Sequence, residues 1–207
     1  MGSEQARAFN GASLASGLPE ALIWEIEMTI NRTAMIDYVD ARIAQTSNSK
    51  HVEQLKVLRA HMVGEVSEDV DALLATISPL RQQYRTWGAP EDLQPASLEA
   101  IRAFYFQRQA LGQLYFQFDI DRLTVADDII ITDGVMTSFV PGAFVVGMGL
   151  QTSQPEAVHE ITMQMLISWP FDETGLLIGE ETYSAVIAVR PLADSEIPAD
   201  LPAALVG

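Results

Sequence analysis

Residues 158–189, VHEITMQMLISWPFDETGLLIGEETYSAVIAV, decide the fold class. Residues 158–169 and 176–189 are rich in β-branched and other apolar residues, as strands are, and Pro170 to Gly175 between them are typical of a turn. The pattern predicts two long antiparallel strands joined by a hairpin connection slightly longer than the commonest one.

The position of the turn predicts which residues of this hairpin face each other. If the turn is centred near residue 173, the numbers of antiparallel partners sum to about 346. The resulting partners are Met165 with Glu181, Met163 with Tyr183, and Ile161 with Ala185. One face then mixes large apolar, small and polar side chains, as the wall of a ligand pocket does. Its members are His159, Ile161, Met163, Met165, Ile167, Trp169, Gly179, Glu181, Tyr183 and Ala185.

Two further strands are expected before this hairpin, at residues 116–125 and 129–140. In the first of them, the apolar residues Phe116 and Ile120 stand at even positions, whereas Leu123 stands at an odd one. Even and odd positions of a strand face opposite sides, so this change predicts a β-bulge near Asp121-Arg122. Because a bulge bends a sheet, we expect the sheet to be curved.

The amino-terminal half of the chain predicts helices. Apolar residues recur at helical spacing, and Ser67 and Ser97 are expected to cap two of the helices. The expected elements are helices at 19–45, 52–66 and 70–77, a short strand at 82–87, and a helix after Ser97. We therefore predict a single soluble α+β domain in which amino-terminal helices cover a curved antiparallel sheet.

Composition excludes several classes of function. The 28 acidic and 12 basic residues give a net charge of −16, which disfavours nucleic-acid and membrane-surface partners. There is no cysteine, and the three histidines lack helical i, i+4 pairing, so we predict no metal site and no cofactor. Residues 1–18 contain no basic cluster followed by an apolar core, which predicts a cytoplasmic protein.

Three segments resemble the nuclear transport factor 2-like superfamily, in particular its polyketide-cyclase-like (SnoaL-like) branch. Residues 58–77 are similar to the helix pair of that family, residues 97–105 to its third helix, and residues 169–183 to its terminal hairpin. The resemblance covers about residues 50–190. It leaves residues 1–49 as an amino-terminal helical extension and residues 191–207 as a carboxyl-terminal tail.

The resemblance implies a cone-shaped α+β barrel, cystatin-like in architecture, with one deep pocket and often a homodimer. Members of the superfamily include ketosteroid isomerases, epoxide hydrolases, dehydratases and cyclases, and also binding modules without catalysis. The superfamily therefore implies a pocket but leaves its chemistry open.

Four residues are candidates for acid–base chemistry: Asp133, His159, Glu181 and Tyr183. Asp133 is either a buried acid or one polar residue on an exposed face. Glu181 is either a pocket carboxylate, whose pKa burial would raise, or a solvated or interface carboxylate. Tyr183 could donate a hydrogen bond to an oxyanion, or lie at the edge of the core. His159 is either at one end of the pocket or structural, since the register separates it from Glu181 by roughly 20 Å.

Candidate ligand-binding residues are aromatic or methionine side chains, each of which could equally be ordinary core. They are Tyr84, Trp87, Tyr105, Met163, Met165 and Trp169. Two functions remain open. The chain binds a small hydrophobic molecule, or it is a cofactor-independent isomerase, dehydratase, cyclase or epoxide hydrolase that uses a buried carboxylate as general base.

Overall fold

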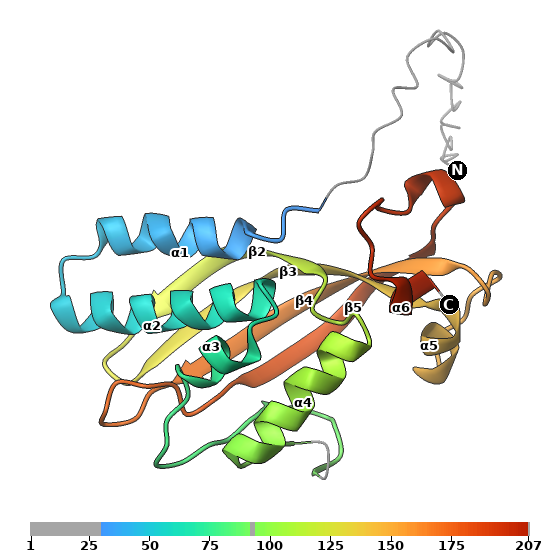
Figure 1. Ribbon diagram of the computed structural model, residues 1–207. Coiled ribbons are helices and arrows are strands. Elements are labelled where there is room, and N and C mark those ends of the chain that lie inside the picture. The colour runs from blue at the N-terminus through green and yellow to red at the C-terminus, as the bar shows by residue number, and fades with distance from the viewer. Residues whose placement is uncertain (1–29, 92–93, 207) are drawn as a thin grey trace, which may run out of the picture.

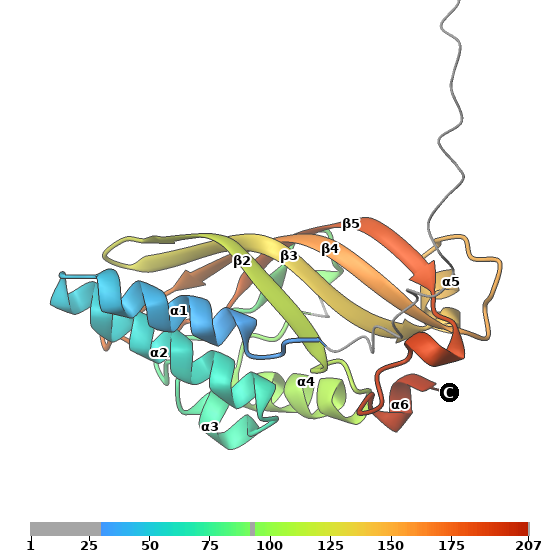
Figure 2. The ribbon, with the colours of Figure 1, turned by 90° about the horizontal axis from the view of Figure 1, so that it is seen from above.

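A computed structural model describes residues 30–91 and 94–206 and shows an α+β architecture. Five strands form one open, curved sheet in the order β1-β5-β4-β3-β2, antiparallel except for the parallel pairing of β1 with β5. Helices α1 to α4 cover the concave face of this sheet (Figures 1 and 2). The predicted fold class is therefore confirmed.

The elements follow each other along the chain with short connections. They are α1 (Ala34–Gln45), α2 (Ser49–Val66), α3 (Val70–Leu74), β1 (Arg85–Thr86), α4 (Leu98–Ala110), β2 (Phe116–Val125), β3 (Ile129–Pro141), α5 (Gly142–Gly147), β4 (Val158–Pro170), β5 (Glu181–Pro191), a 3-10 turn (Asp194–Glu196) and α6 (Ala203–Val206).

The local signals for helices are confirmed in part. Ser97 caps α4, since its hydroxyl accepts a hydrogen bond from the Ala100 amide. Ser67 was wrongly predicted as an N-cap, because it ends α2, and Asp69 caps α3 instead. The first expected helix began at residue 19, but its residues up to 29 lie outside the described part of the chain. Helix α5 was not predicted.

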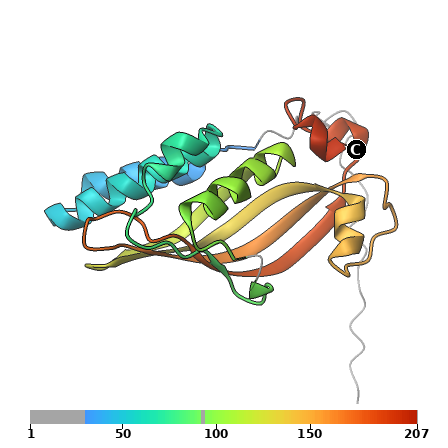
Figure 3. The same ribbon diagram turned by 60° about the horizontal axis from the view of Figure 1, so that its bottom comes forward.

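The predicted bulge is confirmed between β2 and β3. Ile120 pairs with Gly134 and Arg122 with Asp133, so Asp121 is the extra residue. Gly134 is needed at this point, because a Cβ there would overlap the carbonyl of Asp119. The bulge bends the sheet, and Figure 3 shows the long strands curving beneath the helices.

The predicted register of the last hairpin is wrong. Met165 pairs with Ser184, Leu166 with Tyr183, and Ser168 with Glu181, so each partner in β5 lies three residues later than expected. The cause is that residues 177–180 also bond to the segment that leads into β1: the Leu177 carbonyl accepts from the Ser78 amide, and the Ile178 carbonyl from the Gln83 amide.

This shift has a large effect because three is an odd number. Successive side chains of a strand point to opposite faces, so residues 181–186 of β5 lie on the faces opposite to the predicted ones. Beyond the irregularity between Thr162 and Met163 the shift becomes four residues, as in the pair Ile161 and Val189. Thr182 and Ser184 share the concave face with Met165, whereas Glu181 and Tyr183 lie on the convex face.

The core lies between the concave face of the sheet and the helices. Leu55, Leu58 and Met62 of α2 are fully buried, as are Ile101 and Tyr105 of α4. In residues 30–91 and 94–206, no helix has the length and apolar character needed to cross a membrane. The same residues hold no cluster of three metal-ligating side chains.

Candidate functional site

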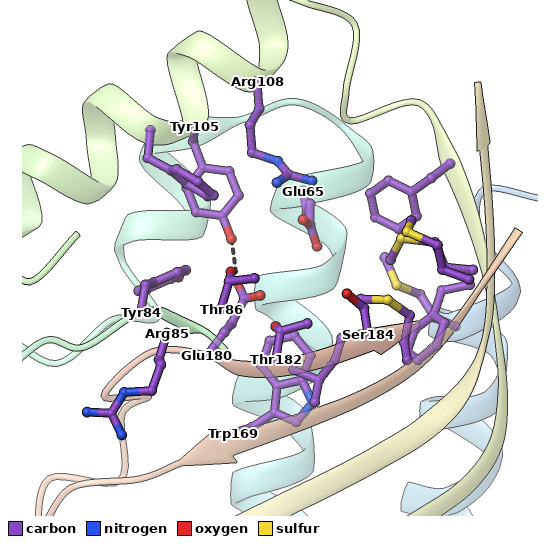
Figure 4. A pocket seen from close by; sticks show the side chains of 18 of the residues that line it. Glu65, Tyr84, Arg85, Thr86, Tyr105, Arg108, Trp169, Glu180, Thr182 and Ser184 are labelled. Carbon is purple, nitrogen blue, oxygen red and sulfur yellow. Dashed lines mark hydrogen bonds between the residues drawn. The ribbon is translucent and has the colours of Figure 1, made fainter. Parts of the chain in front are cut away.

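A cavity of about 220 Å³ lies between the concave face of the sheet and helices α2 and α4. One part of its wall is apolar and includes four methionines, whose flexible side chains adapt to a ligand's shape. The apolar lining consists of Met35, Phe104, Phe116, Phe118, Met136, Met163, Met165, Ile167 and Trp169. The polar lining gathers at α2, α4 and the start of β5 and includes Glu65, Tyr84, Tyr105, Arg108, Glu180, Thr182 and Ser184 (Figure 4).

Glu180, directly before β5, is held by two hydrogen-bonding side chains. The Tyr105 hydroxyl donates to its Oε1 at 2.5 Å, and Nε2 of His61 lies 3.3 Å from the same oxygen. Burial acts to raise the pKa of Glu180, but the contacts with His61 and Tyr105 outweigh it. The pKa of Glu180 is therefore lowered, and this carboxylate is ionised at neutral pH.

Glu65, in the last turn of α2, faces the same cavity without such support. Its carboxyl group makes no hydrogen bond or ion pair within the described residues. Burial, and after it the negative charge of Glu180, raise its pKa to about 7, although His61 and Arg108 act in the opposite direction. Glu65 is therefore half protonated near neutral pH.

The two carboxyl groups are electrostatically coupled. They lie in one cavity, and their surroundings move their pKa values apart, which is the pattern that separates an acid–base group from a permanently charged neighbour. Because they interact, the pair titrates as a unit. Within the pair, Glu65 is the carboxyl group whose pKa lies near 7.

Two hydrogen-bond donors at this cavity lack a partner at good hydrogen-bond geometry within the described residues, although one of them, the Tyr84 hydroxyl, interacts with Tyr105 and Glu180. They are the hydroxyl of Tyr84 and Nε of Arg108, both buried. Burial raises the pKa of Tyr84 well above its usual value, so the hydroxyl keeps its proton. The guanidinium of Arg108 packs over the ring of Phe104 at 5.2 Å. An unpaired buried donor costs free energy, and a ligand oxygen would remove that cost.

Comparisons with known proteins agree with this architecture. A SnoaL-like protein from Shewanella putrefaciens superposes with a TM-score of 0.51 at 13% identity, covering 76% of this chain and 89% of that one. A second, from Shewanella denitrificans, gives a TM-score of 0.51 at 17% identity, covering 64% and 90%. The chain has the nuclear transport factor 2-like fold. No family model and no curated protein sequence matches it.

Five of the six predicted ligand-binding residues line the cavity of this nuclear transport factor 2-like fold: Tyr84, Tyr105, Met163, Met165 and Trp169. Trp87 does not. It lies on the convex face and stacks on Tyr183, with ring centroids 5.0 Å apart and planes at 14°.

None of the four predicted acid–base residues lines the cavity. Asp133 forms an ion pair with Arg122 at 2.7 Å on the convex face, and Glu181 lies 3.9 Å from Arg85. Tyr183 is 46% exposed. For Glu181 and Tyr183 the wrong register is the physical reason, since it exchanged the two faces of β5.

His159 is fully buried but far along β4 from the carboxylate pair, opposite Val140 and Pro191. Its Nδ1 bonds to the Ala157 carbonyl at 2.9 Å, and its Nε2 to the Thr152 hydroxyl at 2.7 Å. Both ring nitrogens are thus used within one loop, which is typical of a structural histidine.

The sequence analysis missed Glu65, Glu180, His61 and Arg108. One signal was present: His61 and Glu65 stand four residues apart in the predicted helix, as do Phe104 and Arg108 in the next, so each pair shares a helix face. The position of Glu180 depends on the true register of β5 and gave no local signal.

Substituting glutamine for Glu65 should change how stability depends on pH. Because folding raises the pKa of Glu65 from 4.5 to about 7, its contribution to stability is full below pH 4.5 and is lost as the pH rises through 7. Glutamine stays neutral at every pH. The free energy of unfolding of Glu65→Gln, relative to that of the wild type, should therefore increase by roughly 1–3 kcal/mol as the pH rises from 4 to 8. Urea denaturation at several pH values measures this gain. A difference that is constant with pH would contradict the raised pKa.

Proposed function

We propose that this protein is an enzyme that moves a proton on a small, largely apolar carbonyl compound, with Glu65 as general base and acid and without a cofactor. The observation that carries the proposal is the unbonded carboxyl of Glu65 facing the cavity beside the hydrogen-bonded Glu180. A general base works best when its pKa is close to the working pH, and that of Glu65 is about 7.

The remaining lining residues fit a substrate of this class. The methionine and aromatic side chains offer an apolar wall for the hydrocarbon part. The unpaired hydroxyl of Tyr84 offers a hydrogen bond to the carbonyl oxygen, and the cation of Arg108 favours the negative charge that develops there. Loss of a proton from the carbon beside the carbonyl to Glu65 would give an enolate, and return of a proton from Glu65 to the same carbon would complete an exchange with solvent.

A second function is favoured by the apolar wall: the cavity binds a hydrophobic molecule without reaction. Proton exchange distinguishes the two. A panel of small apolar ketones and esters is incubated with the protein in D2O near pH 7, and binding and deuterium incorporation beside the carbonyl are followed by NMR. The proposal expects at least one compound to exchange faster than in buffer. If compounds bind in the cavity and none exchanges, the protein is a binding protein.

A further inference from the structure

His61 is a fully buried histidine that has no part in the acid–base chemistry proposed for Glu65. It lies on α2, with its ring edge-on to Tyr105 and Trp169 at centroid distances of 6.2 and 5.7 Å. Nδ1 is 2.8 Å from the Thr76 hydroxyl, and Nε2 is 3.3 Å from Oε1 of Glu180. Both nitrogens therefore have fixed partners.

The direction of the first hydrogen bond follows from the next one. The Thr76 hydroxyl lies 2.6 Å from the Leu73 carbonyl, and a carbonyl oxygen can only accept. The single hydroxyl hydrogen of Thr76 must therefore point at Leu73. Towards His61, Thr76 can then only accept, so the hydrogen in that contact belongs to Nδ1 of His61.

The second ring nitrogen, Nε2, faces two oxygen atoms, the hydroxyl of Tyr105 and Oε1 of Glu180. The Tyr105 hydroxyl donates to Oε1 of Glu180 at 2.5 Å and lies 3.4 Å from Nε2 of His61. With Nδ1 committed to Thr76, Nε2 is the ring nitrogen that faces the ionised Glu180. Contacts at hydrogen-bond distance thus connect Leu73, Thr76, His61 and Glu180 in a row, and the first two hydrogen bonds both run from His61 towards Leu73.

We propose that Thr76 and His61 are positioning residues: Thr76 accepts from Nδ1 of His61 and so fixes the ring with Nε2 against Glu180, which leaves proton exchange to Glu65. The part of this inference that concerns Glu65 rests on the proposed function. Neither Thr76 nor His61 lines the cavity, so both act through Glu180 and do not touch the substrate.

Three groups from two other parts of the fold also interact with the two carboxyl groups. Tyr84 comes from the segment before β1, and Tyr105 and Arg108 come from α4. Both tyrosines remain protonated, because burial raises their pKa values well above the usual range. Arg108 acts on both carboxyl groups in the same direction. Its charge therefore does not distinguish Glu65 from Glu180, whereas the His61 contact does.

The hydrogen-bond chain can be tested without any substrate. The protein has three histidines, and nitrogen-15 NMR of the imidazole rings reports which nitrogen carries hydrogen. For wild type and Thr76→Ser we expect Nδ1 of His61 to carry a hydrogen, because the hydroxyl of residue 76 can only accept from it. For Thr76→Val, which removes the acceptor at nearly constant shape, we expect the hydrogen to leave Nδ1. A wild-type ring without hydrogen on Nδ1 would overturn the proposal.

A second measurement tests the effect on the carboxyl pair. Carbon-13 NMR of the glutamate carboxyl groups, assigned with Glu65→Gln and Glu180→Gln, shows which group takes the proton near pH 7. We expect Glu65 in the wild type and Glu180 in His61→Leu. If Glu65 still takes the proton in His61→Leu, His61 is only structural and the proposal fails. If the NMR results are as expected but the protein exchanges no proton on any carbonyl compound, the proposed function is refuted and the hydrogen-bond chain is not.

Discussion

Glu65→Gln is expected to lower the rate of substrate proton exchange by about 10²–10⁴-fold, the usual contribution of a positioned general base. Glutamine has nearly the shape of glutamate but cannot take up a proton, so the cavity keeps its form while the reaction loses its base. Deuterium incorporation into a compound that the wild type exchanges measures the loss. The binding constant of the compound should change much less than the rate.

The chain offers a matched control in Glu181→Gln. Glu181 follows Glu180 directly, but it lies on the convex face, 3.9 Å from Arg85. The same change of charge there should leave the exchange rate within about twofold of the wild type, since Glu181 is half-buried outside the cavity and surface ion pairs contribute little. Equal losses in Glu65→Gln and Glu181→Gln would mean that net charge, and not the cavity carboxyl, sets the rate.

The fold was predictable from sequence where local patterns decide it. The change of parity between Ile120 and Leu123 was enough to place the bulge at Asp121, and alternation was enough to identify the long strands. The register of β5 was not predictable in this way. It depends on hydrogen bonds that Leu177 and Ile178 make with residues about 100 positions earlier in the chain, and no local pattern records those partners.

The candidate site was predictable only as far as its apolar wall. Met163, Met165 and Trp169 alternate along β4, so any correct strand assignment places them on one face. The carboxyl pair is different, because Glu65 looks like an ordinary polar residue at the end of a helix. Its environment comes from α4 and from the segment before β5, and only the folded chain brings Glu180 beside it.

Gly179→Ala is expected to destabilise the protein by about 3 kcal/mol or more and to disturb the carboxyl pair at the same time. Gly179 precedes Glu180 and has φ of +152°, which side chains rarely adopt. A Cβ there would overlap the carbonyl of Gln83 and approach the ring of Tyr84. Relief would push apart two segments that are joined by hydrogen bonds from Gln83 to Ile178 and from Arg85 to Glu180.

The control for this change is Gly175→Ala in the turn of the same connection. Gly175 also has positive φ, +81°, but a Cβ there would meet nothing within 4 Å. Gly175→Ala should lower the free energy of unfolding by about 1–2 kcal/mol, because only the unfavourable positive φ of a residue with a side chain contributes. Urea denaturation measures both variants, and carboxyl NMR should show altered Glu65 and Glu180 signals only in Gly179→Ala. Equal losses of stability would mean that backbone conformation alone, and not the close approach of Gln83, requires glycine before Glu180.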